Sequence, residues 1–115
     1  MSTLFDASWA FVALLGDLSG DSVTAVTVDG QEVALYRLAD GVFATANACT
    51  HGNARLCDGF VEAGEIECPL HQGRFDIRTG KAMCRPLRED LRIYPVKLDG
   101  ERIYVCLNTA SPSAG

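Results

Sequence analysis

Four residues of this sequence could bind a metal centre, and they occur as two Cys/His pairs. Cys49-Thr50-His51 is followed by sixteen residues and then by Cys68-Pro69-Leu70-His71. Thiolates are soft ligands that suit iron, copper(I) and zinc, whereas imidazole is neutral and borderline. Two of each fit either one tetrahedral zinc ion or a [2Fe-2S] cluster whose two irons have different ligands. The candidate metal ligands are therefore Cys49, His51, Cys68 and His71.

The sequence around these pairs resembles the Rieske [2Fe-2S] motif as it occurs in the ferredoxin branch of that family. It reads CTHGNARL over 49–56 and CPLHQGRFD over 68–76, with the ligands in the Rieske order. The resemblance extends from about Trp9 to Leu107. It implies one cluster held by all four candidate ligands and an all-β Rieske fold. In that fold a base of antiparallel sheets carries a small cluster-binding subdomain at its tip, here about 48–86, with Pro86 in a third loop that covers the cluster.

The resemblance also implies a function, because such ferredoxins are soluble electron carriers of bacterial aromatic ring-hydroxylating dioxygenase systems. It implies transfer of one electron at a time from an NAD(P)H-dependent flavoprotein reductase to a terminal ring-hydroxylating oxygenase. The sequence has only two histidines, both in the motif, so none remains for the mononuclear iron of an oxygenase. A Gly-x-Gly-x-x-Gly nucleotide fingerprint is absent. We therefore expect a carrier that is not an enzyme, served by a separate reductase.

The ligand set bears on the reduction potential of such a cluster. Two ferric ions, two sulfides, two thiolates and two neutral imidazoles sum to zero charge, so an electron is accepted more readily than by a four-Cys cluster. The iron bound by histidines should take that electron. High-potential respiratory Rieske proteins carry Ser and Tyr hydroxyls two and four residues after the second His, and a Cys between the ligands of the second pair. Here these positions are Gly73, Phe75 and Leu70, which predicts a potential near the bottom of the Rieske range of about −150 to +300 mV.

Other functions remain possible from the residues alone. The same ferredoxin could serve a carboxylate-bridged diiron monooxygenase, which only reconstitution with each oxygenase would distinguish. In a different class, the four ligands could stabilise a zinc-containing binding module, although zinc motifs usually have other spacings. A Rieske-type redox sensor would need a regulatory partner that nothing in the sequence indicates.

Composition limits the possible partners and compartment. The 115 residues suffice for one domain, with a formal net charge of −5, which argues against nucleic acid as a partner. The apolar run 9–15 is too short to cross a bilayer, and 1–36 contains no Lys or Arg, unlike a signal peptide. Five cysteines form no evident disulfide framework. We expect a cytoplasmic monomer without membrane association.

Turn signals divide the chain into short strands. Asp29-Gly30 predicts a hairpin between strands 22–28 and 31–38, and Asp40-Gly41 leads into a strand over 42–47. Further hairpins are predicted for 60–62 with 65–68, across Ala63-Gly64, and for 91–98 with 102–107, across Asp99-Gly100. We expect a single Rieske domain over 1–115, a frayed tail over 108–115, and core positions for Trp9, Phe11 and Tyr104.

Several residues near the motif allow a structural or a functional interpretation. A run of basic residues imitates a helical face but contains Gly80 and Pro86, so we interpret it as a solvated surface, with a positive rim beside the cluster as the alternative. Its members are Arg74, Arg78, Lys81, Arg85, Arg88 and Arg92. Asn53, Leu70 and Gln72 could form a contact patch around the histidines. Cys57, Cys84 and Cys106 have no histidine at ligand spacing, and we expect buried or spectator thiols.

Overall fold

The computed structural model describes residues 9–48, 55–69, 73–83, 90–107 and 111–112. All the regular structure in these ranges is β-strand, apart from two single turns of 3-10 helix, η1 (Leu15–Asp17) and η2 (Leu56–Asp58). The strands are β1 (Trp9–Leu14), β2 (Ser22–Val28), β3 (Gln31–Leu38), β4 (Gly41–Ala46), β5 (Phe60–Glu62), β6 (Glu65–Glu67), β7 (Arg74–Asp76), β8 (Arg92–Tyr94), β9 (Val96–Asp99), β10 (Arg102–Cys106) and β11 (Ser111–Pro112). Every strand pair in the described part of the chain is antiparallel, which confirms the predicted all-β fold class.

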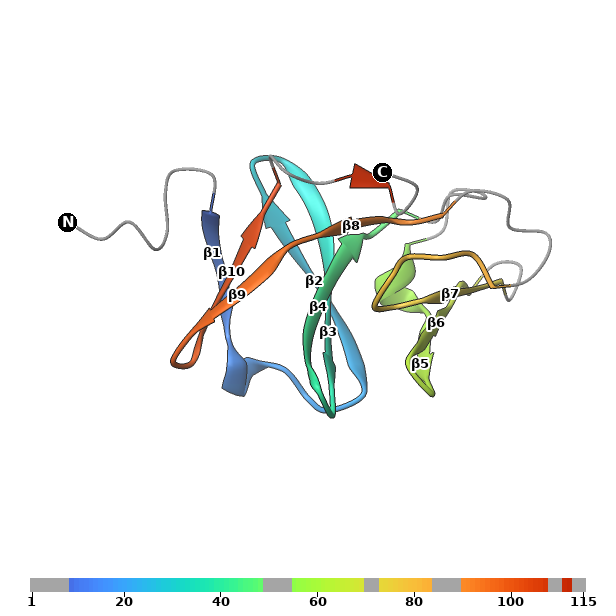
Figure 1. Cartoon of the computed structure of the whole chain (residues 1–115), viewed down its shortest axis with the longest axis horizontal. Helices are drawn as coiled ribbons and strands as arrows, with labels where there is room; N and C mark the ends of the chain where they lie inside the picture. The colour runs from blue at the N-terminus through green and yellow to red at the C-terminus, as the bar shows by residue number, and fades with distance from the viewer. Residues whose placement is uncertain (1–8, 49–54, 70–72, 84–89, 108–110, 113–115) are drawn as a thin grey trace.

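Two sheets form the base of the molecule (Figure 1). One has the order β1-β10-β9, and the other has the order β11-β8-β4-β3-β2. The β2–β3 hairpin turns at Asp29-Gly30 as predicted, since both residues have positive φ angles, 50° and 81°, which a two-residue hairpin turn of the primed type needs. An apolar core lies between the two sheets and includes Val33, Leu35 and Ile103, all fully buried.

A third, small sheet has the order β5-β6-β7 and stands to one side of the base (Figure 1). Its first hairpin turns at Ala63-Gly64, again with two positive φ angles, 55° and 78°, as the sequence predicted. The small sheet shares a second apolar core with the base, because Tyr36 from β3 packs in the same cluster as Ile66 of β6 and Phe75 of β7. This core attaches the small sheet to the five-stranded sheet.

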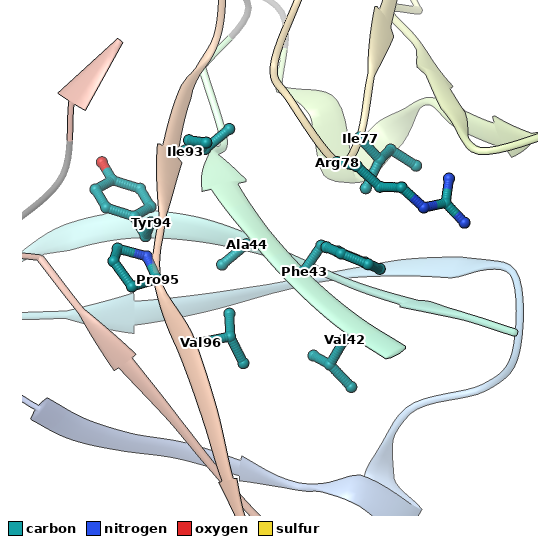
Figure 2. A pocket seen from close by; sticks show the side chains of 9 residues that line it. All are labelled: Val42, Phe43, Ala44, Ile77, Arg78, Ile93, Tyr94, Pro95 and Val96. Atoms are coloured by element: carbon teal, nitrogen blue, oxygen red, sulfur yellow. The ribbon is translucent and has the colours of Figure 1, made fainter. Parts of the chain in front are cut away.

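Polar contacts also join the small sheet to the base. The guanidinium of Arg78, in the turn after β7, donates to both carboxylate oxygens of Asp40 at 3.0 and 2.6 Å. The same guanidinium lies over the ring of Phe43, 5.3 Å from its centroid. Both side chains line a cavity of about 260 Å³ between β4, the β8–β9 segment and the turn after β7. Figure 2 shows the residues that line it. The junction is therefore held by an apolar core and, at its edge, by the contacts of Arg78 with Asp40 and Phe43, which we call the Arg78 clasp.

The structure corrects four details of the predicted plan. The strand predicted over 91–98 is two strands, because Pro95 separates β8 from β9 and the two belong to different sheets. Of the three predicted core residues, Phe11 is 53% exposed with its ring against Tyr104, and Trp9 and Tyr104 are half-buried, so none of them belongs to either apolar core. Strands β1 and β7 were not predicted. Ser111–Pro112 pairs with β8, so the prediction of a frayed tail is wrong for these two residues, since backbone pairing needs no apolar pattern.

Among the described residues, no helix has the length and apolar character needed to span a membrane.

Candidate metal centre

One of the four predicted ligands lies among the described residues. Cys68 directly follows β6 and is 1% exposed, in the same apolar cluster as Leu56 and Phe75. The other three ligands, Cys49, His51 and His71, lie outside the described residues, as do Asn53, Leu70, Gln72, Cys84 and Pro86. What the structure does define is the frame from which each ligand segment starts and to which it returns.

The second ligand segment is closed at its base by a backbone hydrogen bond. The Cys68 N–H donates to the Gly73 carbonyl at 2.7 Å, and directly below it Glu67 of β6 pairs with Arg74 of β7. In the sequence His71 lies between these two ends. The β6–β7 pairing therefore fixes the points at which the segment with the CPLH motif leaves and rejoins the small sheet.

The first ligand segment is closed where β4 ends and η2 begins. Ala48 and Arg55 form an isolated antiparallel bridge, and the Leu56 N–H donates to the Asn47 carbonyl at 2.7 Å. The side chain of Asn47 adds a further bond, because its Oδ1 accepts from the Cys57 N–H at 2.9 Å. In the sequence both ligands of the first pair lie between the two sides of this closure, which we call the first neck (residues 47–48 and 55–57).

A third segment starts beside β7, the strand that follows the second ligand segment, and its two ends lie close together. The Met83 N–H donates to the Arg74 carbonyl at 2.8 Å, and the Ala82 N–H donates to a carboxylate oxygen of Asp90 at 2.8 Å. Ala82 also forms a bridge with Phe75, the middle residue of β7. The third segment therefore begins next to the strand that follows the second ligand segment. The predicted third loop around Pro86 belongs to this segment.

Carboxylates surround the cation nearest the second closure. Arg74 donates to Glu65, Glu62 and Glu67 at 3.3, 3.2 and 3.0 Å. The pKa of Arg74 is raised above its ordinary value, mainly by its hydrogen bond to Glu65 and to a smaller extent by its hydrogen bond to Glu62. Arg74 therefore stays charged. Arg74 and Arg78 are thus both paired with acids, which favours the interpretation of a solvated surface over a positive rim at these two positions.

The residues present fit a Rieske-type group. A buried Cys at the end of a strand offers a thiolate in an apolar setting, and two Cys with two His make the donor set of a cluster with unlike irons. Phe75 is fully buried, and Gly73 is also buried. No side-chain hydroxyl therefore comes from either of the two positions at which the respiratory Rieske proteins have Ser and Tyr.

Sequence reasoning missed the polar residues of the first neck. Asn47 is 1% exposed, and its side chain binds Glu32 of β3 and Cys57 of η2, which are 15 and 10 residues away. No local pattern marks such partners. Cys57 was expected to be a buried or spectator thiol, and it is half-buried and accepts from the Asn47 amide at 3.4 Å. Cys106 is buried, as predicted.

This chain is similar in sequence to a protein family and to several characterised proteins. The model of the Rieske [2Fe-2S] domain matches residues 8–95. The ferredoxin component of naphthalene 1,2-dioxygenase/salicylate 5-hydroxylase systems from Ralstonia sp is 52% identical over 96 residues, which cover 84% of this chain and 92% of that protein. The ferredoxin component of a naphthalene 1,2-dioxygenase system from Pseudomonas aeruginosa is 48% identical over 100 residues, covering 87% and 96%.

Solved structures agree with the curated relatives. The ferredoxin of carbazole 1,9a-dioxygenase from Nocardioides aromaticivorans IC177 has a TM-score of 0.83 and 43% identity, covering 87% of this chain and 98% of that one. A chain in a complex of reduced oxygenase and oxidised ferredoxin of carbazole 1,9a-dioxygenase has a TM-score of 0.82 and 31% identity, covering 88% and 94%. The same fold therefore occurs in ferredoxins that have been observed together with their oxygenase.

Proposed function

Because the chain belongs to the Rieske [2Fe-2S] domain family, we propose that one cluster is held by its two cysteine and two histidine ligands, Cys49, His51, Cys68 and His71. The observation that carries the proposal is the family match over residues 8–95, together with the buried position of Cys68 at the closed base of the second ligand segment. When bound, the cluster supplies reversible uptake of one electron.

The chain is an electron carrier of the ferredoxin type and not an enzyme, as the names of its relatives indicate. Its electrons go to the terminal oxygenase of an aromatic ring-hydroxylating dioxygenase system. We propose that they come from an NAD(P)H-dependent flavoprotein reductase, because the sequence has no nucleotide fingerprint of its own.

We further propose that the carrier works as a cytoplasmic monomer. The half-buried thiol of Cys57 is in no disulfide, which suits a reducing compartment. A carrier that visits two partners in turn needs interfaces that release quickly, at or below about 1,200 Å² of buried surface. A low potential suits reduction by a flavin, and the buried Phe75 without a hydroxyl supports a value near the bottom of the Rieske range.

Metal analysis of anaerobically purified protein tests the proposal. We expect two iron and two acid-labile sulfide per chain, as a [2Fe-2S] cluster requires, with a Rieske-type electron paramagnetic resonance (EPR) signal after dithionite reduction. Cys68→Ser should lose the signal, and Cys106→Ser, a change at a buried thiol outside the motif, should keep it. A colourless wild-type protein with one zinc and no sulfide would overturn the assignment.

Reconstitution tests the partners. The purified carrier should support turnover when it is mixed with a ring-hydroxylating oxygenase and a flavoprotein reductase of such a system. Omission of the carrier, or its replacement by the Cys68→Ser variant, should abolish product formation. Turnover with a diiron monooxygenase but with no ring-hydroxylating oxygenase would refute the partner assignment.

A further inference from the structure

Asn47 is a buried polar residue of the first neck, two positions before the proposed ligand Cys49. It is 1% exposed and makes three hydrogen bonds to two other segments of the chain. Oδ1 accepts from the Cys57 N–H at 2.9 Å, while Nδ2 donates to Glu32 Oε1 at 3.1 Å and to Cys57 Sγ at 3.4 Å. Both ends of the amide are therefore used, and the side chain is locked in one orientation.

Glu32 continues this network to the other side of the first neck. Its carboxylate accepts from Arg55 Nε at 3.2 Å and from Arg55 Nη2 at 2.9 Å, the two-bond geometry that makes an arginine–carboxylate pair specific. Glu32 therefore bonds to Asn47 on one side of the first neck and to Arg55 on the other side. Side chains close the first neck in addition to its backbone bonds.

We propose that Asn47 is a positioning residue for the cluster, which acts by holding the first neck closed and thereby keeping the Cys49 and His51 ligands in place. The inference rests on the proposed function, since it concerns the ligands of the proposed cluster. Nothing in the sequence motif or in the names of the relatives assigns a role to this position.

Removal of the Asn47 side chain takes a hydrogen-bond partner from both Cys57 and Glu32. In the wild type the Cys57 N–H donates to Asn47 Oδ1. In Asn47→Ala this part-buried donor loses its partner, which favours opening of the neck to water. The Glu32 carboxylate keeps Arg55 but loses the Asn47 amide, although the Asn47 N–H still donates to the Glu32 backbone carbonyl at 3.4 Å. The first neck then depends on the Ala48–Arg55 bridge and the Leu56–Asn47 backbone bond. Because the first ligand pair lies between its two sides, opening of the neck should expose the metal.

The experiment compares two Asn47 variants with a matched control. Asn47→Ala removes all three bonds, while the isosteric Asn47→Asp keeps an acceptor for the Cys57 N–H but removes the amide donor and adds charge beside Glu32. The control is Thr45→Val in β4, two residues before Asn47. It deletes the buried 2.8 Å hydrogen bond between Thr45 and Tyr36 and the 2.8 Å bond that Thr45 Oγ1 donates to the Ala46 carbonyl. Burial raises the pKa of Tyr36, so this pair is neutral and insensitive to pH.

Three quantities are measured on the anaerobically purified holoproteins. They are the thermal midpoint, the rate of iron release to a chelator at a temperature well below every midpoint, and the EPR spectrum after reduction. Both Asn47 variants should release iron at least on the order of tenfold faster than wild type, because each loses two or three part-buried hydrogen bonds and the loss of one corresponds to about that factor. Their EPR lines should broaden, since a looser neck allows a spread of cluster geometries. Thr45→Val should lower the midpoint but keep wild-type release and line shape.

Each outcome decides between the proposals. Asn47 variants that release iron no faster than Thr45→Val, with unchanged EPR lines, would show a merely structural role and overturn the inference while leaving the proposed function standing. If wild type contains no iron and no sulfide, the proposed function fails, and the inference fails with it. Should Asn47→Ala not fold, Asn47→Asp and the exposed Glu32→Gln still decide the question, since Glu32→Gln should also speed iron release, by a smaller factor.

Discussion

Gly59 lies where the first neck meets the small sheet, and replacing it with alanine should disturb the centre through a single methyl group. Gly59 ends η2 with φ −94° and ψ −160°, a backbone conformation that any residue adopts. The obstacle is space, because a Cβ at this position would overlap the carbonyl oxygen of Glu67. The carbonyl carbon of Glu67 and the carbonyl oxygen of Leu56 would each lie 3.2 Å away. Neither neighbour is a flexible side chain that could turn aside.

The expected cost follows from this geometry. The Glu67 carbonyl belongs to β6, whose partners β5 and β7 hold it on both sides, so the methyl group can be accommodated only by moving the strand. Inserting a methyl into such a packed site costs about 1–3 kcal/mol. In a chain of this size that lowers the thermal midpoint by about 5–15 °C. Because Cys68 directly follows Glu67, the same movement should displace a cluster ligand and lower the iron content.

The assay is the thermal midpoint and the iron-to-protein ratio of Gly59→Ala beside Gly20→Ala. A Cβ at Gly20 would meet no atom within 4 Å, and its φ is not positive, so the control makes the same chemical change without the overlap. Gly20→Ala should be neutral or stabilising by up to about 1 kcal/mol. A Gly59→Ala protein as stable as Gly20→Ala and fully loaded with iron would refute the reasoning, since the overlap would then have been relieved at no cost to Cys68.

Four further outcomes are expected. Phe75→Tyr adds a hydroxyl four residues after the second histidine ligand and should raise the reduction potential by about 60 mV. This shift corresponds to one charge-assisted hydrogen bond of about 1.4 kcal/mol for a one-electron couple. An unchanged potential in a redox titration would contradict this prediction. The pKa of Glu32 lies below its ordinary value of 4.5, and the largest cause is the hydrogen bond from Asn47. The ionised Glu32 carboxylate therefore stabilises the fold above pH 4.5, and this stabilisation is lost as the pH falls through the folded-state pKa. The midpoint of wild type should therefore exceed that of Glu32→Gln at pH 7, and the difference should shrink below about pH 4.5. Arg78→Met, which removes the clasp to Asp40, should lower the midpoint slightly and less so at 1 M salt; a salt-independent loss would point to packing instead. Removal of the metal with a chelator should abolish amide-exchange protection in β5–β7 first and leave β2, β3, β9 and β10 protected, and a uniform loss of protection would contradict two separable cores.

The hairpins could be predicted from the sequence because their cause is local. Asp29-Gly30 and Ala63-Gly64 each supply two residues with positive φ, and the turn fixes the register of the flanking strands. Strand β1 escaped prediction because a register shift between Phe11 and Ala13 interrupts its alternation of buried and exposed residues. Such a bulge depends on the partner strand β10 and leaves no mark in β1 itself.

Part of the candidate site could be predicted from local sequence, and part depends on contacts between distant segments. The ligand types and spacing of the motif are dictated by the metal, so they can be read directly from the chain. The closure of the first neck depends on contacts between Asn47, Glu32 and Arg55, which come from three separate segments. A buried asparagine has no sequence signature, because its partners are defined only once the strands are packed together.

Strand β3 explains how one small domain can carry a metal subdomain on a base with a separate core. Its side chains alternate between the two cores, with Val33 and Leu35 facing the β1-β10-β9 sheet and Ala34 and Tyr36 facing the small sheet. Both faces are covered, and the four residues are fully buried, which is why this segment of an antiparallel sheet reads as a continuous apolar run. Of the described residues between 48 and 86, none belongs to the core between the base sheets, so the burial of that core does not depend on the small sheet. The small sheet has the opposite dependence, because its apolar residues are buried against Ala34 and Tyr36 on the face of β3 that points away from the base core.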